Sequence, residues 1–142
     1  MPLDYVALQF AGTTRRACVR ELCGADEEAV ADSFTPSAIH LVDRLLVNRD
    51  GCLAPGASES LTAFDRDRLL ATVYRRGFTD RIESTVACTA CGDRFDLNFS
   101  LDQLIASLES QRSDGGAEAD GYVHTADGAV FRLPNGREEC LA

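Results

Sequence analysis

The chain has 142 residues, of which 45% are hydrophobic and 26% charged, and this composition is typical of one ordinary globular domain with a small appendage. A formal net charge of −9 argues against a nucleic-acid-binding protein, because affinity for phosphate backbones comes largely from Lys and Arg. No stretch approaches the ~18 apolar residues that cross a bilayer, and residues 1–10 lack the features of a signal peptide. We therefore expect a cytoplasmic protein without a membrane span, in which the six cysteines are reduced thiols or metal ligands.

The first 24 residues have the pattern of a β-hairpin. Residues 5–10 and 16–22 read as two strands, and residues 11–14 between them supply a turn. Cys18 and Cys23 have a C-x4-C spacing that metal ligands can adopt. Their positions within and at the end of a strand favour buried small side chains instead.

Two helices are predicted in the next part of the chain, on either side of a loop at residues 48–58. Thr35-Pro36 is a typical helix start, and the residues after it form an apolar stripe at helical spacing. Thr62 is the expected N-cap of the second helix, which ends at Gly77. We interpret its first turn, residues 65–68, as solvated and held by local ion pairing such as Asp65 with Arg68.

Residues 60–111 carry the clearest pattern in the chain: helix, strand, cysteine turn, strand and helix. Polar and apolar residues alternate strictly from Arg94 to Leu101, as in a half-buried strand. This pattern predicts that the hairpin and its two flanking helices form the main core. The residues expected to face that core are Phe95, Leu97, Phe99 and Leu101. Ser100 and Gln103 form a capping box for the last helix, whose expected buried residues are Leu101, Leu104, Ile105 and Leu108.

The last part of the chain has two predicted sections. Residues 113–120 have the composition of a flexible linker, and residues 121–142 read as a hairpin followed by the start of a truncated helix. Asp127-Gly128 predicts a two-residue turn that pairs His124 with Phe131. We expect the exposed apolar residues of this hairpin to serve self-association or a partner.

The expected fold class is therefore α+β. Small antiparallel hairpins, one of them with a C-x2-C turn like a zinc knuckle, pack with three to four short helices. Residues 1–112 form the core and include the cysteine hairpin.

Cys88 and Cys91 form this C-x2-C pair, and Gly92 follows directly. The pair is half of a structural zinc site, because such a site needs four ligands. Candidates for the other two ligands are Cys18, Cys23, Cys52, Cys140, His40, His124 or residues of another chain. Metal-free reduced thiols are the main alternative. A redox pair is a third, although its first cysteine normally sits at a helix N-terminus and both flanks here read as strands.

Several short motifs, in this order, resemble the baseplate hub and hub-assembly proteins of contractile phage tails and related contractile injection systems. The resemblance rests on the stretch DRDRLLATVYRRGFTDRIESTVACTACGDRFDLNFSLDQL, with RELCGADEEAV before it and AVFRLPNGREE after it. Longer members continue into a helical region with a second C-x2-C pair, which this sequence lacks. Arg137 stands where the family tends to have an acidic or small residue.

The resemblance implies a non-enzymatic structural or assembly protein that binds other baseplate or hub proteins. It would act in the cytoplasm during assembly and could remain in the assembled particle. The residues agree in that no nucleophile–base pair or phosphate-binding loop is present in residues 60–111. Two alternatives stay open: a zinc-ribbon adaptor outside phage biology and a small thiol oxidoreductase.

Overall fold

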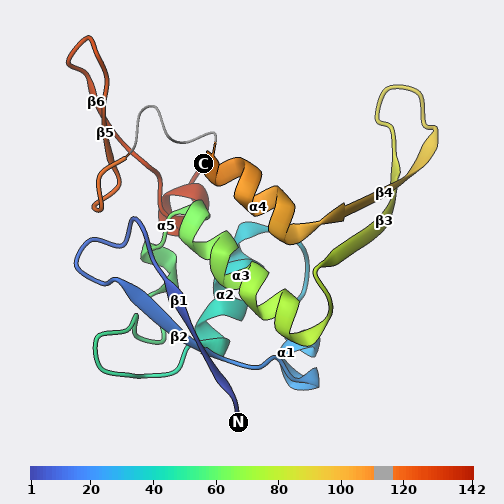
Figure 1. Ribbon diagram of the computed structural model, residues 1–142, viewed down its shortest axis with the longest axis horizontal. Helices are drawn as coiled ribbons and strands as arrows, with labels where there is room; N and C mark the ends of the chain where they lie inside the picture. Colours follow the sequence, from blue (N-terminus) through green and yellow to red (C-terminus); the bar gives the residue numbers. More distant parts are fainter. Residues whose placement is uncertain (111–116) are drawn as a thin grey trace.

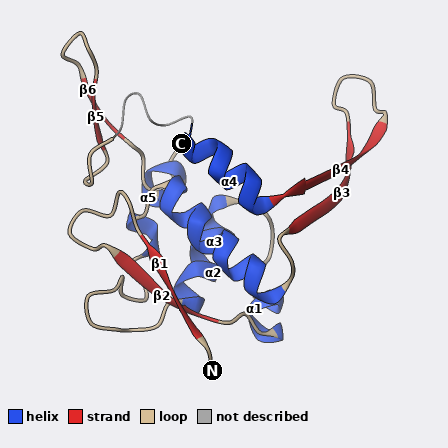
Figure 2. Cartoon of the chain, viewed as in Figure 1, coloured by secondary structure: helices blue, strands red, loops and turns tan. Residues whose placement is uncertain are grey.

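A computed structural model describes residues 1–110 and 117–142 and has the expected α+β fold class (Figures 1 and 2). The elements are β1 (Leu3–Ala7), β2 (Arg16–Arg20), α1 (Gly24–Glu28), α2 (Thr35–Leu45), the 3-10 helix η1 (Ser58–Ser60), α3 (Ala63–Gly77), β3 (Arg81–Ala87), β4 (Arg94–Ser100), α4 (Leu101–Ser110), β5 (Tyr122–His124), β6 (Val130–Arg132) and α5 (Gly136–Glu139). The strands form three separate antiparallel pairs, β1–β2, β3–β4 and β5–β6. Residues 113–116 of the expected linker lie outside the described residues. No helix in the described ranges is long and apolar enough to cross a membrane.

The hydrophobic core lies between the β1–β2 hairpin and helices α2 and α3. Alternation along the first strand buries every second residue, and the buried partners come from the two helices and from the loops that follow α2. The core residues are Val6, Leu8, Ala17, Val19, Val42, Leu45, Leu46, Leu53, Leu61, Leu69 and Val73. Cys18 is buried on β2, as expected, but Cys23 is exposed, so the prediction for Cys23 was wrong.

Asp65 and Arg66 in the first turn of α3 are buried, whereas Asp67 is exposed, so the sequence-based interpretation of a solvated turn was wrong for the first two. Thr62 caps the helix as predicted, since its side chain accepts a hydrogen bond from the Asp65 N–H. The Asp65 carboxylate is fully buried and accepts hydrogen bonds from the backbone N–H groups of Gln9 (2.7 Å) and Phe10 (2.8 Å). It therefore ties the segment after β1 to α3, and the expected pairing of Asp65 with Arg68 is absent, because Arg68 pairs with Glu109.

The C-terminal turn is docked on the body of the protein. Asn135 caps α5 in a reciprocal capping box with Glu138. The Gly136 N–H donates to the Leu61 carbonyl, and the buried Arg66 guanidinium pairs with Glu139 at 2.6 Å. These contacts place α5 against η1 and α2, next to the start of α3 (Figure 1).

The β3–β4 hairpin extends away from the helices as an arm (Figure 1), and this overturns the prediction that it lies in the main core. Phe95 and Leu97 are 51% and 41% exposed. Phe99 and Leu101 are only half-buried, and no residue of α4 is buried. The alternation correctly showed which side chains share a face, but toward the tip of the hairpin no other element of the described chain covers that face.

The β5–β6 hairpin has a register one residue different from the predicted one. His124 pairs with Val130, and Val123 rather than His124 pairs with Phe131. The loop therefore has three residues and ends in Gly128 at φ +84°, a conformation that suits glycine. The Asp127 carboxylate accepts from the Thr125 hydroxyl and the Ala129 N–H, and these bonds stabilise the longer loop.

Candidate functional site

The arm is a two-stranded ribbon with one apolar and one polar face. Residues paired across an antiparallel ladder share a face, and the pairs Ile82–Phe99, Ser84–Leu97 and Val86–Phe95 fall on one side. The pairs on the other side are Arg81–Ser100, Glu83–Asn98, Thr85–Asp96 and Ala87–Arg94. We call the first set the arm face: Ile82, Ser84, Val86, Phe95, Leu97 and Phe99.

At its base, the arm face continues into an apolar groove between α3 and α4. The groove has a volume of about 860 Å³. Its lining is mostly apolar: Phe64, Asp67, Arg68, Leu70, Ala71, Tyr74, Ile82, Leu101, Leu104, Ile105 and Leu108. Ile82 belongs to both the arm face and the groove, so the two surfaces are continuous. Exposed apolar surface of this extent, rimmed by polar residues, is typical of a protein-binding site.

Asp80, which directly precedes β3, joins the base of the arm to the start of α4. Its carbonyl accepts from the Leu101 N–H, and its carboxylate accepts from the Ser100 hydroxyl and the Asp102 N–H. The Ser100 side chain in turn accepts from the Gln103 N–H at 3.2 Å, as expected of the predicted cap. Hydrogen bonding to Ser100, the largest contribution, and to Asp102 lowers the pKa of Asp80. The base of the arm is thus held firmly against the start of α4.

The cysteine turn closes the far end of the arm. The Cys88 N–H donates to the Asp93 carbonyl, so the pair Cys88–Asp93 extends the ladder, and the Gly92 N–H donates to the Cys88 carbonyl. Gly92 has φ +79°, which the tight turn requires. Hydrogen bonding from the backbone of Cys91, the largest contribution, from the backbone of Ala90 and from the Cys91 side chain lowers the pKa of the Cys88 thiol. Backbone donors beside a sulfur also stabilise a metal-bound thiolate.

The other predicted ligands do not join Cys88 and Cys91. Cys18 is buried on β2, Cys23 donates to Asp26, and His124 on β5 lies 3.5 Å from Glu118. In residues 1–110 and 117–142, no three His, Cys, Asp or Glu side chains come together as a metal site. The two thiols therefore fit zinc chemically but supply half of the four ligands that a structural site needs.

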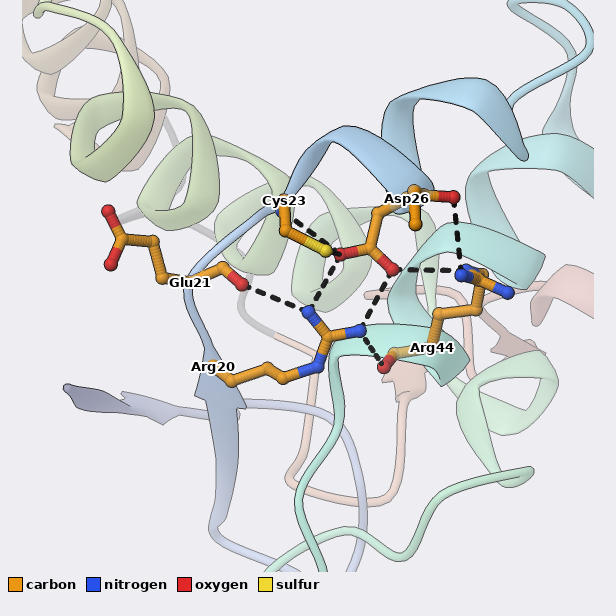
Figure 3. Close-up of polar contacts among 6 residues, drawn as sticks. Arg20, Glu21, Cys23, Asp26 and Arg44 are labelled. Carbon is orange, nitrogen blue, oxygen red and sulfur yellow. Dashed lines mark hydrogen bonds and ion pairs between the residues drawn. The ribbon is translucent and has the colours of Figure 1, made fainter. Parts of the chain in front are cut away.

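A cluster of charged residues around the buried Asp26 lies apart from the arm and was not predicted from the sequence (Figure 3). The fully buried Asp26 carboxylate accepts from Arg20 in two bonds of 2.7 and 2.8 Å and from the Arg44 Nε at 3.1 Å. The Cys23 thiol and N–H also donate to it. The bonds from Arg20, more than any other contribution, hold the pKa of Asp26 well below its usual range.

This cluster joins β2, α1 and α2. Hydrogen bonds from residues of the cluster occupy both oxygens of the Asp26 carboxylate. Its geometry therefore suits a structural role. The sequence held one signal of this cluster: Asp26 stands three positions after Cys23, where the acidic residue of a capping box lies. The two arginine partners come from other elements and could not be inferred from local sequence.

Comparison with known proteins does not assign the chain to a family. A scan against protein-family models gives no match, and searches of curated proteins and of solved structures give none either. The functional argument therefore depends on the arm, the groove and the cysteine turn.

Proposed function

We propose that this protein is a non-enzymatic structural or assembly component that acts through protein–protein contacts, with the arm face as its main binding surface. One observation carries the proposal: a two-stranded ribbon presents Phe95 and Leu97 to solvent although both residues belong to a continuous apolar surface. An isolated two-stranded hairpin is marginally stable in water. Covering its apolar face with another protein would stabilise it and remove exposed apolar area from water.

The setting that we propose is the baseplate of a contractile phage tail or a related injection system. Its support is the ordered set of short motifs in residues 15–140 that resemble baseplate hub and hub-assembly proteins. The acidic composition fits a protein that binds other proteins rather than nucleic acid. Assembly would take place in the cytoplasm, where the cysteines stay reduced.

A complementation experiment tests this proposal. In the producing strain, the gene is deleted and replaced by wild type, by Leu97→Asp on the arm face or by Ala87→Asp on the polar face, where the new carboxylate lies opposite Arg94. Assembled particles are counted by electron microscopy. We expect wild type and Ala87→Asp to restore particles and Leu97→Asp to fail, because a charge at residue 97 cannot be desolvated in an apolar interface.

Equal particle counts for the two variants would contradict the proposed role of the arm face. The setting has its own test: sheath, tube and spike genes should lie beside this gene. Their absence would remove the contractile-tail assignment and leave a general assembly role.

A further inference from the structure

The cysteine turn and the arm face are parts of one surface. Cys88 follows Val86 by two residues and extends the same ladder through its bond to Asp93, so alternation places it on the side of the ribbon that carries Val86 and Phe95. The Cys88 thiol therefore lies at the tip of the exposed apolar face, with Cys91 in the turn directly beyond it, and a protein that covers this face also reaches this turn.

From this juxtaposition we infer that two copies of the chain pack their arm faces together and share one structural zinc ion, held by Cys88 and Cys91 of each copy. The inference rests on the proposed function, since it names the partner that the arm face binds. The other occupants of the same surface are a different protein or none, and the experiment below distinguishes them.

The number of ligands favours a second copy. Structural zinc takes four ligands in a tetrahedron, commonly four cysteines with Zn–S distances of ~2.3 Å. Each chain offers one pair, and no described residue of the same chain completes the set. A two-fold axis running along the arms brings the two tips together and doubles the pair to four sulfurs. This closed two-fold arrangement is the commonest form of protein association.

Charge and shape favour the same arrangement. Two chains of formal net charge −9 repel each other over most of their surfaces. All six residues of the arm face are uncharged, whereas the opposite face carries Arg81, Glu83, Arg94 and Asp96. The arm face is therefore a place where two copies can approach without pairing like charges. With the two-fold axis along the arms, β4 of each copy faces β3 of the other, so the phenylalanines of one copy meet Ile82 and Val86 of the other.

The chemistry of the site balances without a redox step. Four thiols bind one Zn²⁺ as thiolates and release four protons, and no electrons are transferred. A site closed by four protein ligands leaves no open position for water, so the metal stabilises the interface and has no catalytic role.

The test is made on the full chain, purified without chelator. Light scattering after size exclusion gives the mass of the particle, and elemental analysis gives zinc per chain. The variants are the double substitution Cys88→Ser/Cys91→Ser and the matched control Cys52→Ser/Cys140→Ser, which removes two thiols outside the arm. Leu97→Asp and Ala87→Asp form a second matched pair. Circular dichroism melting shows whether each variant is folded.

We expect wild type to be a dimer with one zinc per two chains, and the control variants to match it. The Cys88/Cys91 variant should lose all zinc, and both it and Leu97→Asp should be folded monomers. Chelation of the wild type should give monomer, and added Zn²⁺ should restore the dimer. Co²⁺ in place of zinc should give the absorption of a tetrahedral tetrathiolate, which two thiols alone would not produce.

Three results would overturn the inference: a monomer with one zinc per chain, a dimer that keeps its mass without Cys88 and Cys91, or a wild type without zinc. If the wild type is a monomer and assembles particles, whereas Leu97→Asp does not assemble them, the dimer is rejected and the proposed function stays intact. The two failures are thus distinguishable.

Discussion

Asp65 gives the most quantitative prediction about how the body of the protein is held together. Its buried carboxylate is the acceptor for two backbone N–H groups, from Gln9 and Phe10, at 2.7 and 2.8 Å. Hydrogen bonds to a charged group contribute about 1.5–3 kcal/mol each. The bond to Phe10 is fully buried and that to Gln9 is partly buried, so we place the second near the lower end of this range.

Asp65→Ala should therefore lower the free energy of unfolding by about 3 kcal/mol, after a gain of ~0.5 kcal/mol from the better helix propensity of alanine. For a chain of this size, that corresponds to a fall in Tm of roughly 10 °C. Asp65→Asn should also be destabilised, because its amide offers one acceptor oxygen for two N–H donors and turns its NH2 group toward one of them. Thermal and urea unfolding followed by circular dichroism measure both quantities.

Asp67→Ala is the matched control, because this aspartate lies on the same helical turn but is exposed. Its effect should stay within about 0.5 kcal/mol of wild type. If Asp65→Ala and Asp67→Ala melt within 2 °C of each other (roughly 0.5 kcal/mol), the carboxylate does not tie the segment after β1 to α3, and the energetic reasoning is wrong.

The remaining predictions concern the core, the ion cluster and the docked C-terminal turn. In the monomer obtained by chelation, Phe95→Ala should lower the free energy of unfolding by less than about 1 kcal/mol, because the ring is half exposed. Leu45→Ala, in the core, should lower it by about 3–4 kcal/mol. Equal losses for the two variants in urea unfolding would contradict the assigned core. Asp26→Ala should cost about 3 kcal/mol, because it leaves two arginines without their buried partner, and a melt unchanged from wild type would exclude a structural role for the cluster. Because the pKa of Asp26 is lowered in the folded state, the carboxylate should contribute fully to stability above about pH 4, the unfolded value, and this contribution should be lost as the pH falls further. If the difference in unfolding free energy between wild type and Asp26→Asn does not shrink on acidification, this assignment is wrong. Gly136→Ala would place a Cβ 2.7 Å from the Ile39 Cδ1 atom and should cost about 1–3 kcal/mol, and Ile39→Val, which removes that atom, should recover part of the loss in a double-mutant cycle.

Local sequence patterns predicted the features that depend on near neighbours. The cap at Thr62, the end of α3 at Gly77 and the strand at residues 94–100 are all fixed by residues within a few positions of each other. The turn around Cys88 and Cys91 was likewise predictable, because Gly92 follows the second cysteine and can take the positive φ that the turn needs.

The features that the sequence did not reveal depend on distant partners. Alternation in residues 94–101 identified an apolar face but carried no information about what covers it. Burial of Asp65 and Arg66 depends on partners 55 to 73 residues away, so both looked like solvated helix residues. In the β5–β6 hairpin, the side-chain bonds of Asp127 favoured a three-residue loop over the two-residue turn that Asp-Gly suggests.

The central claim is that the arm face is an interface rather than part of the chain's own core. Hydrogen exchange, measured by mass spectrometry on zinc-loaded wild type at low and high protein concentration, tests it most directly. Amides of β3 and β4 should exchange more slowly as concentration rises, while amides of β2 and α3 should exchange at the same rate in both samples. Protection of the arm that does not depend on concentration across the range, in a protein that sediments as a monomer, would contradict the account.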